Sequence, residues 1–230
     1  VDRLKGLGNP EMVRAFLEGD WTILAGSMFD DVFDRSIHIL SKGWMTIGTE
    51  SKQKWKYNRC FDWGWSRPFS VLWFVELTED YQGSWGAGNK KRTFKKGVRW
   101  SPSQIAEAIR DKESRMPVPI MPGPADRSIY DGDTNIAGDM ANLGIHWTPS
   151  DKSSGSRIRG WQKLREYFQS ALQQPPEAPG LYVLETCAQL LRTMMLCERD
   201  KGRPDDLDTN SEDHLLDALR YRILEIPKTM

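Results

Sequence analysis

The sequence predicts a mixed α/β fold in which helices cover both faces of one sheet. Residues 57–77 contain β-rich runs separated by a short turn, and beyond residue 100 helical and strand-like segments alternate. Residues 71–75 are continuously apolar, as is typical of a strand buried on both faces. Strands joined by tight turns pair antiparallel, whereas strands separated by helices pair in parallel. We therefore expect the first three strands to be antiparallel and the later ones parallel.

The first hundred residues are expected to hold one short helix and three strands. A helix is predicted over residues 10–18, because Asn9 is a suitable cap and Pro10 fits the first turn. Residues 19–33 mix glycine, aspartate and aromatic residues and are predicted to be irregular or to form short strands. Strands are predicted at residues 57–63 and 69–77, on either side of the turn-forming residues 64–68. A third strand is predicted at residues 92–100.

Helices dominate the remainder. One begins after Ser101, a good N-cap followed by Pro102 at the first helical position. A short strand is predicted at residues 118–121, ending at the Pro-Gly-Pro of residues 122–124. Helices are then predicted at residues 134–143, 157–172 and 187–197, with extended segments at 145–148 and 181–184. The closing helix is predicted over residues 211–224, with Ser211 as its cap.

The composition argues against several classes of protein. Acidic and basic residues number 32 each, so net charge indicates neither a nucleic-acid nor a membrane partner. The three cysteines are scattered, which argues against a disulfide framework or structural zinc and fits a reducing compartment. No apolar run approaches the roughly 20 residues of a membrane-spanning helix, and no signal peptide is visible. Because the chain begins at Val1 without methionine, we expect it to be part of a longer protein.

The closing helix carries the densest group of chemically active side chains. At helical spacing, one face is apolar and consists of Leu215, Leu216, Leu219 and Ile223. The opposite side carries Asp213, His214, Asp217 and Tyr221. The two aspartates are one turn apart, where like charges repel. This face is therefore either a solvated surface or a place where a cation binds.

Two aspartates elsewhere supply partners for that helix. Asp62 lies within the first apolar run, where a carboxylate is costly unless it is paired or bound to a metal; the alternative is an aspartate that accepts a hydrogen bond from the turn at Gly64. Asp126 follows the fourth main strand, where it alone is equally consistent with a turn, a cap or an ion pair to Arg127. Together with Asp217 they would gather at one sheet edge. Such hard oxygen ligands suit Mg²⁺ or Mn²⁺, and two ions about 4 Å apart support phosphodiester hydrolysis.

Basic residues gather in two segments, residues 90–99 and 152–165. Each is either a solvated face or a surface that contacts DNA phosphates without reading bases. The candidate DNA-binding residues are Lys90, Lys91, Arg92, Lys95, Lys96, Lys152, Arg157 and Arg159.

Three motifs taken together resemble those of the C-terminal nuclease domain of large terminase subunits from tailed phages or prophages. They are Asp-Trp-Gly-Trp-Ser-Arg-Pro at residues 62–68, Ala-Asp-Arg-Ser-Ile-Tyr-Asp at 125–131, and Glu-Asp-His-Leu-Leu-Asp-Ala-Leu-Arg-Tyr at 212–221. Segments 19–21 and 144–161 resemble further parts of the family in the same order. The resemblance spans nearly the whole chain. It implies a ribonuclease H-like fold and a metal-dependent endonuclease that cleaves concatemeric viral DNA during genome packaging.

The resemblance also implies roles for individual residues. The carboxylates that would bind two Mg²⁺ or Mn²⁺ ions are Asp62, Asp126 and Asp217. His214 and Asp213 would be auxiliary members of the same site, His214 assisting a metal or a proton transfer and Asp213 as a further metal ligand. Arg127 stands where relatives often have proline, which leaves Asp131 or Asp133 as alternatives to Asp126.

Domain organisation and partners follow from the same resemblance. Residues 1–53 are expected to lead in from an ATPase motor domain, and residues 54–230 to form the nuclease domain. The spacing of Gly83 and Gly88 matches a P-loop, but Asn89 stands in the lysine position, so we expect no nucleotide site. The implied partners are double-stranded DNA, the motor domain, the portal protein and the small terminase subunit, in the host cell cytoplasm and with no membrane. Two other classes stay open: a non-catalytic nucleic-acid-binding or assembly module, and another ribonuclease H-like nuclease of the resolvase or transposase type.

Overall fold

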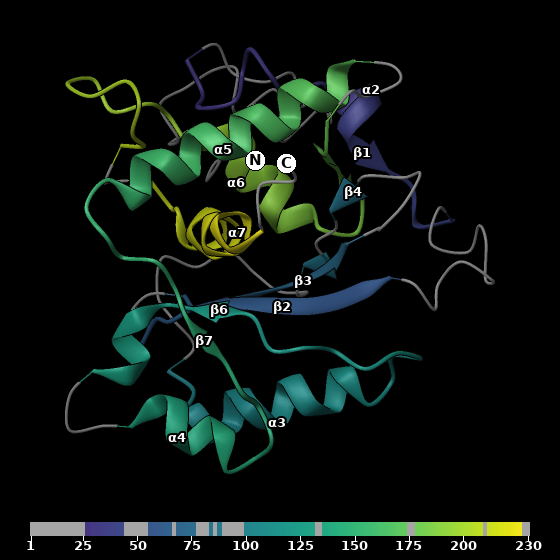
Figure 1. The fold of residues 1–230 in the computed structure, drawn as a ribbon, viewed down its shortest axis with the longest axis vertical. Helices are drawn as coiled ribbons and strands as arrows, with labels where there is room; N and C mark the ends of the chain where they lie inside the picture. The colour runs from purple at the N-terminus through teal and green to yellow at the C-terminus, as the bar shows by residue number, and fades with distance from the viewer. Residues whose placement is uncertain are drawn as a thin grey trace, which may run out of the picture.

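A central sheet lies between two layers of helices, which confirms the mixed α/β fold (Figure 1). The computed structural model describes residues 26–43, 55–65, 68–76, 83–84, 87–88, 99–131, 135–173, 178–208 and 211–226. The helix predicted at residues 10–18 and most of the third predicted strand lie outside these residues. Within them, no helix is both long and apolar enough to cross a membrane.

The antiparallel half of the sheet is built on its two longest strands. Strand β2 (Lys56–Asp62) pairs with β3 (Ser70–Glu76), so that Asp62 lies opposite Ser70. Both strands are almost entirely buried, as their apolar composition predicts. Strands β4 (Gly83–Ser84) and β5 (Ala87–Gly88) both pair antiparallel with β3.

The parallel half extends the sheet on the other side of β2. Strand β6 (Pro124–Ala125) pairs parallel with β2, and β7 (Thr148–Pro149) pairs parallel with β6. Strand β8 (Gly180–Leu181) pairs parallel with β4 at the far edge, which gives the order β7-β6-β2-β3-β4-β8. A separate two-stranded sheet joins β1 (Ile39–Leu40) and β9 (Val183–Leu184) in parallel.

Helices α3 and α4 cover one face of the sheet (Figure 1). Helix α3 (Pro102–Glu113) begins with a capping box, in which Ser101 and Gln104 satisfy each other's backbone N–H groups. Its apolar side packs on Phe61 and Trp73 of the sheet, together with the short helix α4 (Ile136–Ala141). This layer therefore follows the local sequence signals closely.

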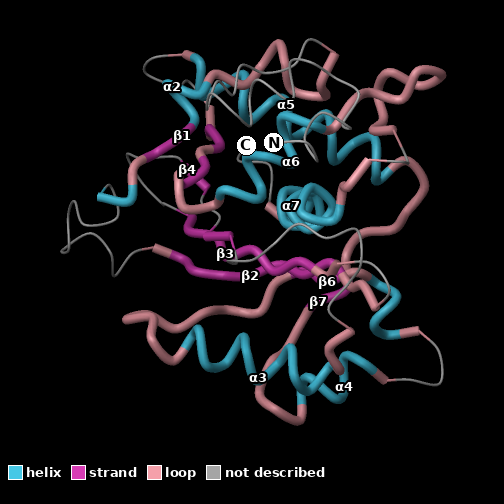
Figure 2. Tube along the Cα trace, turned by 180° about the vertical axis from the view of Figure 1, so that it is seen from behind, coloured by secondary structure: helices cyan, strands magenta, loops and turns pink. Residues whose placement is uncertain are grey.

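Helices α5, α6 and α7 cover the other face (Figure 2). Helix α5 (Ser156–Leu172) packs across α7 (His214–Glu225), and α6 (Ala188–Leu196) lies beside them. Gly160 allows the close approach of α5 and α7, because a Cβ at that position would overlap the side chain of Arg220. Helix α7 also contacts β2, β3 and β6, which places it directly above the centre of the sheet.

The described part of the N-terminal segment belongs to this second layer. Met28, Phe29, Val32 and Phe33 are buried in the core under α5 and α6. Helix α2 (Arg35–His38) leads into β1, which pairs with β9. The boundary expected near residue 53 stays a prediction.

Three local predictions were wrong in their details. Of the strand predicted at 118–121, only Met121 forms a bridge, to Asn58, because Pro122 has no N–H with which to extend the ladder. The strand that pairs in parallel with β2 is β6. The segment at 181–184 is split between two sheets, since β8 pairs with β4 and β9 with β1. Arg99 and Trp100 are not in a strand, and Arg99 has a left-handed backbone with φ of 53°.

Candidate active site

The carboxyl ends of the central strands meet beneath the start of α7. Asp62 is the last residue of β2, and Asp126 directly follows β6. The Asp126 N–H donates to the Phe61 carbonyl at 2.9 Å, so the parallel pairing of these strands places the two aspartates side by side. Lys152 comes shortly after β7, at the same edge of the sheet. The Ser150 N–H, just after the end of β7, donates to the Ala125 carbonyl of β6.

Asp62 is a buried carboxylate, 4% exposed. His214 donates from Nδ1 to its Oδ2 at 2.9 Å, and the Tyr221 hydroxyl lies 3.3 Å from its Oδ1. Burial raises the pKa of Asp62 to about 7, and the negative charges of Asp217 and Asp126 act in the same direction. The bond from His214 opposes this shift without cancelling it. Asp62 is therefore a carboxylate whose charge is poorly compensated by the described residues around it.

Asp126 has more partners than Asp62. It caps the short 3₁₀ helix η4 (Arg127–Tyr130) by accepting the Ser128 N–H at 2.8 Å. Its Oδ2 accepts from the Tyr221 hydroxyl at 3.1 Å and forms an ion pair with Lys152 at 3.4 Å. Burial acts to raise the pKa of Asp126, but the Ser128 N–H, Lys152 and Tyr221 together lower it below its usual value. The cap proposed from the sequence is present, and the cation of the described ion pair is Lys152 rather than Arg127.

Tyr221 joins the two aspartates from α7. Its hydroxyl lies between their carboxylates and accepts a hydrogen bond from Lys152 Nζ at 2.9 Å, and Nζ also lies 4.7 Å from the ring centroid. Burial and the neighbouring carboxylates raise the pKa of Tyr221, so the hydroxyl keeps its proton. Helical spacing placed this tyrosine beside Asp217 and His214, but the sequence assigned it no role.

Asp217 and Asp213 are bound to arginine side chains rather than to Asp62 or Asp126. Arg157 of α5 lies 3.3 Å from Asp217 and 3.2 Å from Asp213, and its Nε donates to Asp206 at 2.7 Å. Arg220 donates to Asp217 from the other side, at 2.9 Å. The structure thus joins His214 to Asp62 directly and Asp62 to Asp126 through the Tyr221 hydroxyl, and it holds the other two predicted ligands against guanidinium groups.

This arrangement also changes the start of α7. The helix begins at His214 rather than at Ser211, and Asp213 occupies the N-cap position without a side-chain cap bond. The Asp213 carboxylate faces Arg157 instead, and burial followed by the charge of Asp217 raises its pKa. The first turn is anchored to the sheet, because the Ser70 hydroxyl donates to the His214 carbonyl at 2.8 Å.

The donor set fits a divalent cation in part. Asp62 and Asp126 present hard oxygen atoms around one shared hydroxyl, and the cationic Lys152 already lies against them. Among the described residues, however, no three acidic, histidine or cysteine side chains form a ready-made metal site. A third carboxylate would have to come from Asp217 or Asp213, which are bound to arginines here.

The predicted DNA-binding residues fall into two groups. Lys90, Lys91, Arg92, Lys95 and Lys96 lie outside the described residues, as does Asp133. Of the described ones, Lys152 borders the site, Arg157 faces three carboxylates, and Arg159 is half exposed and paired with Asp151. Asp131 is exposed just after η4.

Two buried partners of this network were missed by the sequence reasoning. Asp206 accepts from Arg157 and from the Trp161 indole N–H at 3.0 Å. Arg220 is 3% exposed and stacks between Trp161 and Tyr221. Its position one turn after Asp217 was a usable signal, because residues three apart meet on a helix surface. Asp206 has no such local signal.

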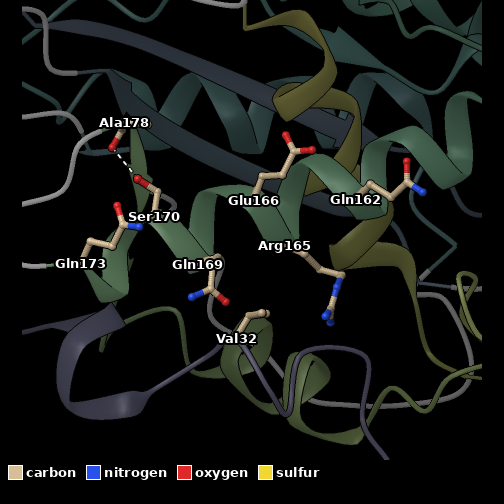
Figure 3. A pocket seen from close by; sticks show the side chains of 8 residues that line it. All are labelled: Val32, Gln162, Arg165, Glu166, Gln169, Ser170, Gln173 and Ala178. Carbon is tan, nitrogen blue, oxygen red and sulfur yellow. Dashed lines mark hydrogen bonds between the residues drawn. The ribbon is translucent and has the colours of Figure 1, made fainter.

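A separate hollow of about 560 Å³ lies along α5 (Figure 3). It is lined by Val32, Gln162, Arg165, Glu166, Gln169, Ser170, Gln173 and Ala178. None of these residues belongs to the acidic site. The Ser170 hydroxyl closes one end by donating to the Ala178 carbonyl at 2.6 Å.

The fold and the acidic sheet edge define a class, that of mixed α/β domains with carboxylates gathered at the ends of the central strands. Solved structures narrow the comparison to phage large terminases. The nuclease domain of P22 large terminase is similar with a TM-score of 0.59 and 17% identity, over 86% of this chain and 90% of that domain. The large terminase of a thermophilic bacteriophage gives a TM-score of 0.63 and 15% identity, over 87% of this chain.

This chain covers 44% of the thermophilic phage protein, and so spans less than half of its length. At such low identities the likeness shows the fold, which is that of the terminase nuclease domain. No protein-family model matches the sequence, and no curated protein matches it either.

Proposed function

We propose that this chain is the nuclease domain of a terminase large subunit, a metal-dependent endonuclease that cuts concatemeric viral DNA during packaging. The observation that carries the proposal is the buried Asp62, which lies beside Asp126 at the carboxyl edge of a terminase-like sheet. A buried carboxylate next to another carries a cost in stability. A bound divalent cation would remove that cost, so the carboxylate pair is best explained as a cation-binding site.

We propose Asp62 and Asp126 as the first ligands of Mg²⁺ or Mn²⁺, with Asp217 or Asp213 completing the site for two ions after leaving Arg157. Such ions supply an activated water and stabilise the leaving oxygen of a phosphodiester. The chain itself contributes His214, which donates Nδ1–H to Asp62 and so leaves Nε2 to accept or release a proton. Burial acts to lower the pKa of His214, but Asp62, Asp213 and Asp217 raise it above its usual value.

The proposed substrate is double-stranded DNA, held by its phosphates. Lys152 and Arg159 are partly exposed near the site, at 38% and 50%, and are positioned to contact phosphate oxygens. The basic segment at residues 90–96 would add to this contact. An ATPase motor domain of the same polypeptide, a portal protein and a small terminase subunit are the proposed partners, in the cytoplasm of the host cell.

A plasmid-cleavage assay tests the proposal. Supercoiled plasmid should be nicked and linearised with Mg²⁺ or Mn²⁺ and left intact with EDTA. Loss of a residue that merely supports a metal ligand typically costs 10–100-fold, so Asp62→Asn should cost at least about 100-fold. The matched control is Asp111→Asn, which removes an exposed carboxylate paired with Arg115 on the opposite helical layer. An intact plasmid with both ions, or full activity in Asp62→Asn, would refute the proposal.

A non-catalytic nucleic-acid-binding module is the second candidate. It is favoured by the arginine partners of Asp217 and Asp213, which leave no three-ligand site preformed among the described residues. The melting temperature separates the two candidates. Cations that bind only the folded site raise it, whereas a binding module without an ion site shows no shift at millimolar Mn²⁺.

A further inference from the structure

We propose that Lys152 is a placeholder cation, meaning that its ammonium group compensates the Asp62–Asp126 pair in the metal-free protein and must move away before a divalent ion binds there. Lys152 would thereby set the ion concentration at which the site fills. This inference rests on the proposed function, and it gives Lys152 a role distinct from simple contact with DNA.

The position of Lys152 supports the inference. Its Nζ donates to the Tyr221 hydroxyl at 2.9 Å and lies 3.4 Å from Asp126 Oδ2. That same hydroxyl is the group shared by both aspartates. The ammonium therefore contacts Asp126 directly and reaches Asp62 through the Tyr221 hydroxyl.

The neighbouring cations of α5 and α7 are committed to other carboxylates. Arg157 and Arg220 face Asp217, on the side of α7 toward α5. His214 is bonded to Asp62 alone of the pair. Within the part of the chain that the structure describes, the ion pair of Asp126 is with Lys152. A divalent ion entering between Asp62 and Asp126 would meet this ammonium group at close range.

The chemistry of lysine suits a cation that leaves. An ammonium group is a compact charge on a flexible stem, whereas a guanidinium group binds a carboxylate through a rigid fork. The Lys152 side chain is 38% exposed, compared with 18% for Asp126. Nζ can therefore turn toward water without any movement of the strands, whereas Arg157 is tied to three carboxylates at once.

Calorimetric titration of the metal-free chain with MnCl₂, without DNA, tests the proposal. Removing one positive charge from a partly exposed site should tighten Mn²⁺ binding about three- to tenfold in Lys152→Met, since each tenfold change corresponds to about 1.4 kcal/mol. Lys152→Arg keeps the charge and should bind Mn²⁺ no more tightly than the wild type. Arg115→Met removes an equal charge from the opposite layer, where Arg115 is 72% exposed, and should match the wild type.

Thermal unfolding in EDTA provides the second reading. Lys152→Met should lower the melting temperature in EDTA and show a larger rise with Mn²⁺ than the wild type, because its acid pair is then uncompensated. Equal Mn²⁺ affinity in the wild type and Lys152→Met would overturn the placeholder role and leave the proposed function intact. Failure of both proteins to bind Mn²⁺ would overturn the proposed function and the placeholder role together. A loss of DNA affinity with unchanged Mn²⁺ affinity would show that Lys152 is only a phosphate contact.

Discussion

Helices α3 and α7 lie on opposite faces of the same two strands, β2 and β3. The buried charged residues beneath the two helices differ in how well they are paired. Beneath α3, the buried Arg59 is bound to Glu113 at 2.9 Å, and Glu113 also accepts the Trp73 indole N–H at 2.8 Å. Beneath α7, the buried Asp62 faces further carboxylates and, among the described residues, receives side-chain bonds from His214 and Tyr221. One face pairs its buried charge, whereas the other leaves it with too little compensation.

The starts of the two helices differ in the same sense. Helix α3 begins with a complete capping box at Ser101. Helix α7 begins at Asp213, whose side chain binds Arg157 instead of capping the helix. Local rules are obeyed where the role is structural and broken beside the acidic site. Function is expected at sites that violate such rules, because a fold keeps a destabilising local feature where that feature serves function.

The largest effect is expected from breaking the paired face. Glu113→Gln removes the partner of Arg59, whose side chain is 3% exposed, and leaves a buried charge uncompensated. Such a loss typically costs about 3–5 kcal/mol of unfolding free energy. Urea unfolding measures it, and the rise in melting temperature with Mn²⁺ should be unchanged. A cost below about 1 kcal/mol would mean that Arg59 finds another partner, since surface ion pairs reach only that value.

The face beneath α7 should lose stability as the pH rises. The pKa of Asp62 is raised from 3.8 to about 7 by burial and by its carboxylate neighbours, so the folded protein holds this proton where the unfolded chain has lost it. The stability contributed by that proton is complete below pH 3.8 and is lost as pH rises through 7. Asp62→Asn should therefore become more stable than the wild type in EDTA, by about 2–3 kcal/mol more at pH 8 than at pH 5.

Denaturant unfolding at the two pH values measures this difference. The groups that face Asp62 are His214, Asp126, Asp217, Tyr221 and, through Tyr221, Lys152. Burial acts to lower the pKa of His214 but its carboxylate neighbours raise it, so its contribution to stability is also lost as pH rises. Millimolar Mn²⁺ should abolish the loss of stability that the wild type shows between pH 5 and pH 8. Parallel stability curves for the two proteins in EDTA would show that Asp62 carries no such strain.

The sequence predicted the elements of both faces and only part of the site. The Ser101 cap was sufficient to locate α3 and the apolar periodicity to locate α5, and the order of the strands placed Asp62 and Asp126 at one edge. The pairing of Asp217 with Arg157 was out of reach, because it depends on the contact of α5 with α7 that Gly160 allows. Asp206 lies 49 residues from Arg157, and no periodicity links positions so far apart.

The smallest expected effect is the change in unfolding free energy when the N-cap residue of each helix is replaced. Ser101→Ala removes a cap bond of 3.2 Å to the Gln104 N–H and should cost about 1 kcal/mol of unfolding free energy, the usual value for an N-cap. Asp213→Ala removes no cap bond. It also relieves a carboxylate whose pKa is raised by burial and by Asp217, while Arg157 keeps Asp206 and Asp217 as partners. Asp213→Ala should therefore cost less than Ser101→Ala in urea unfolding at pH 7 in EDTA. If Asp213→Ala costs as much as Ser101→Ala or more, then the start of α7 is a structural element like that of α3, and the departure from the capping rule at Asp213 is no mark of function.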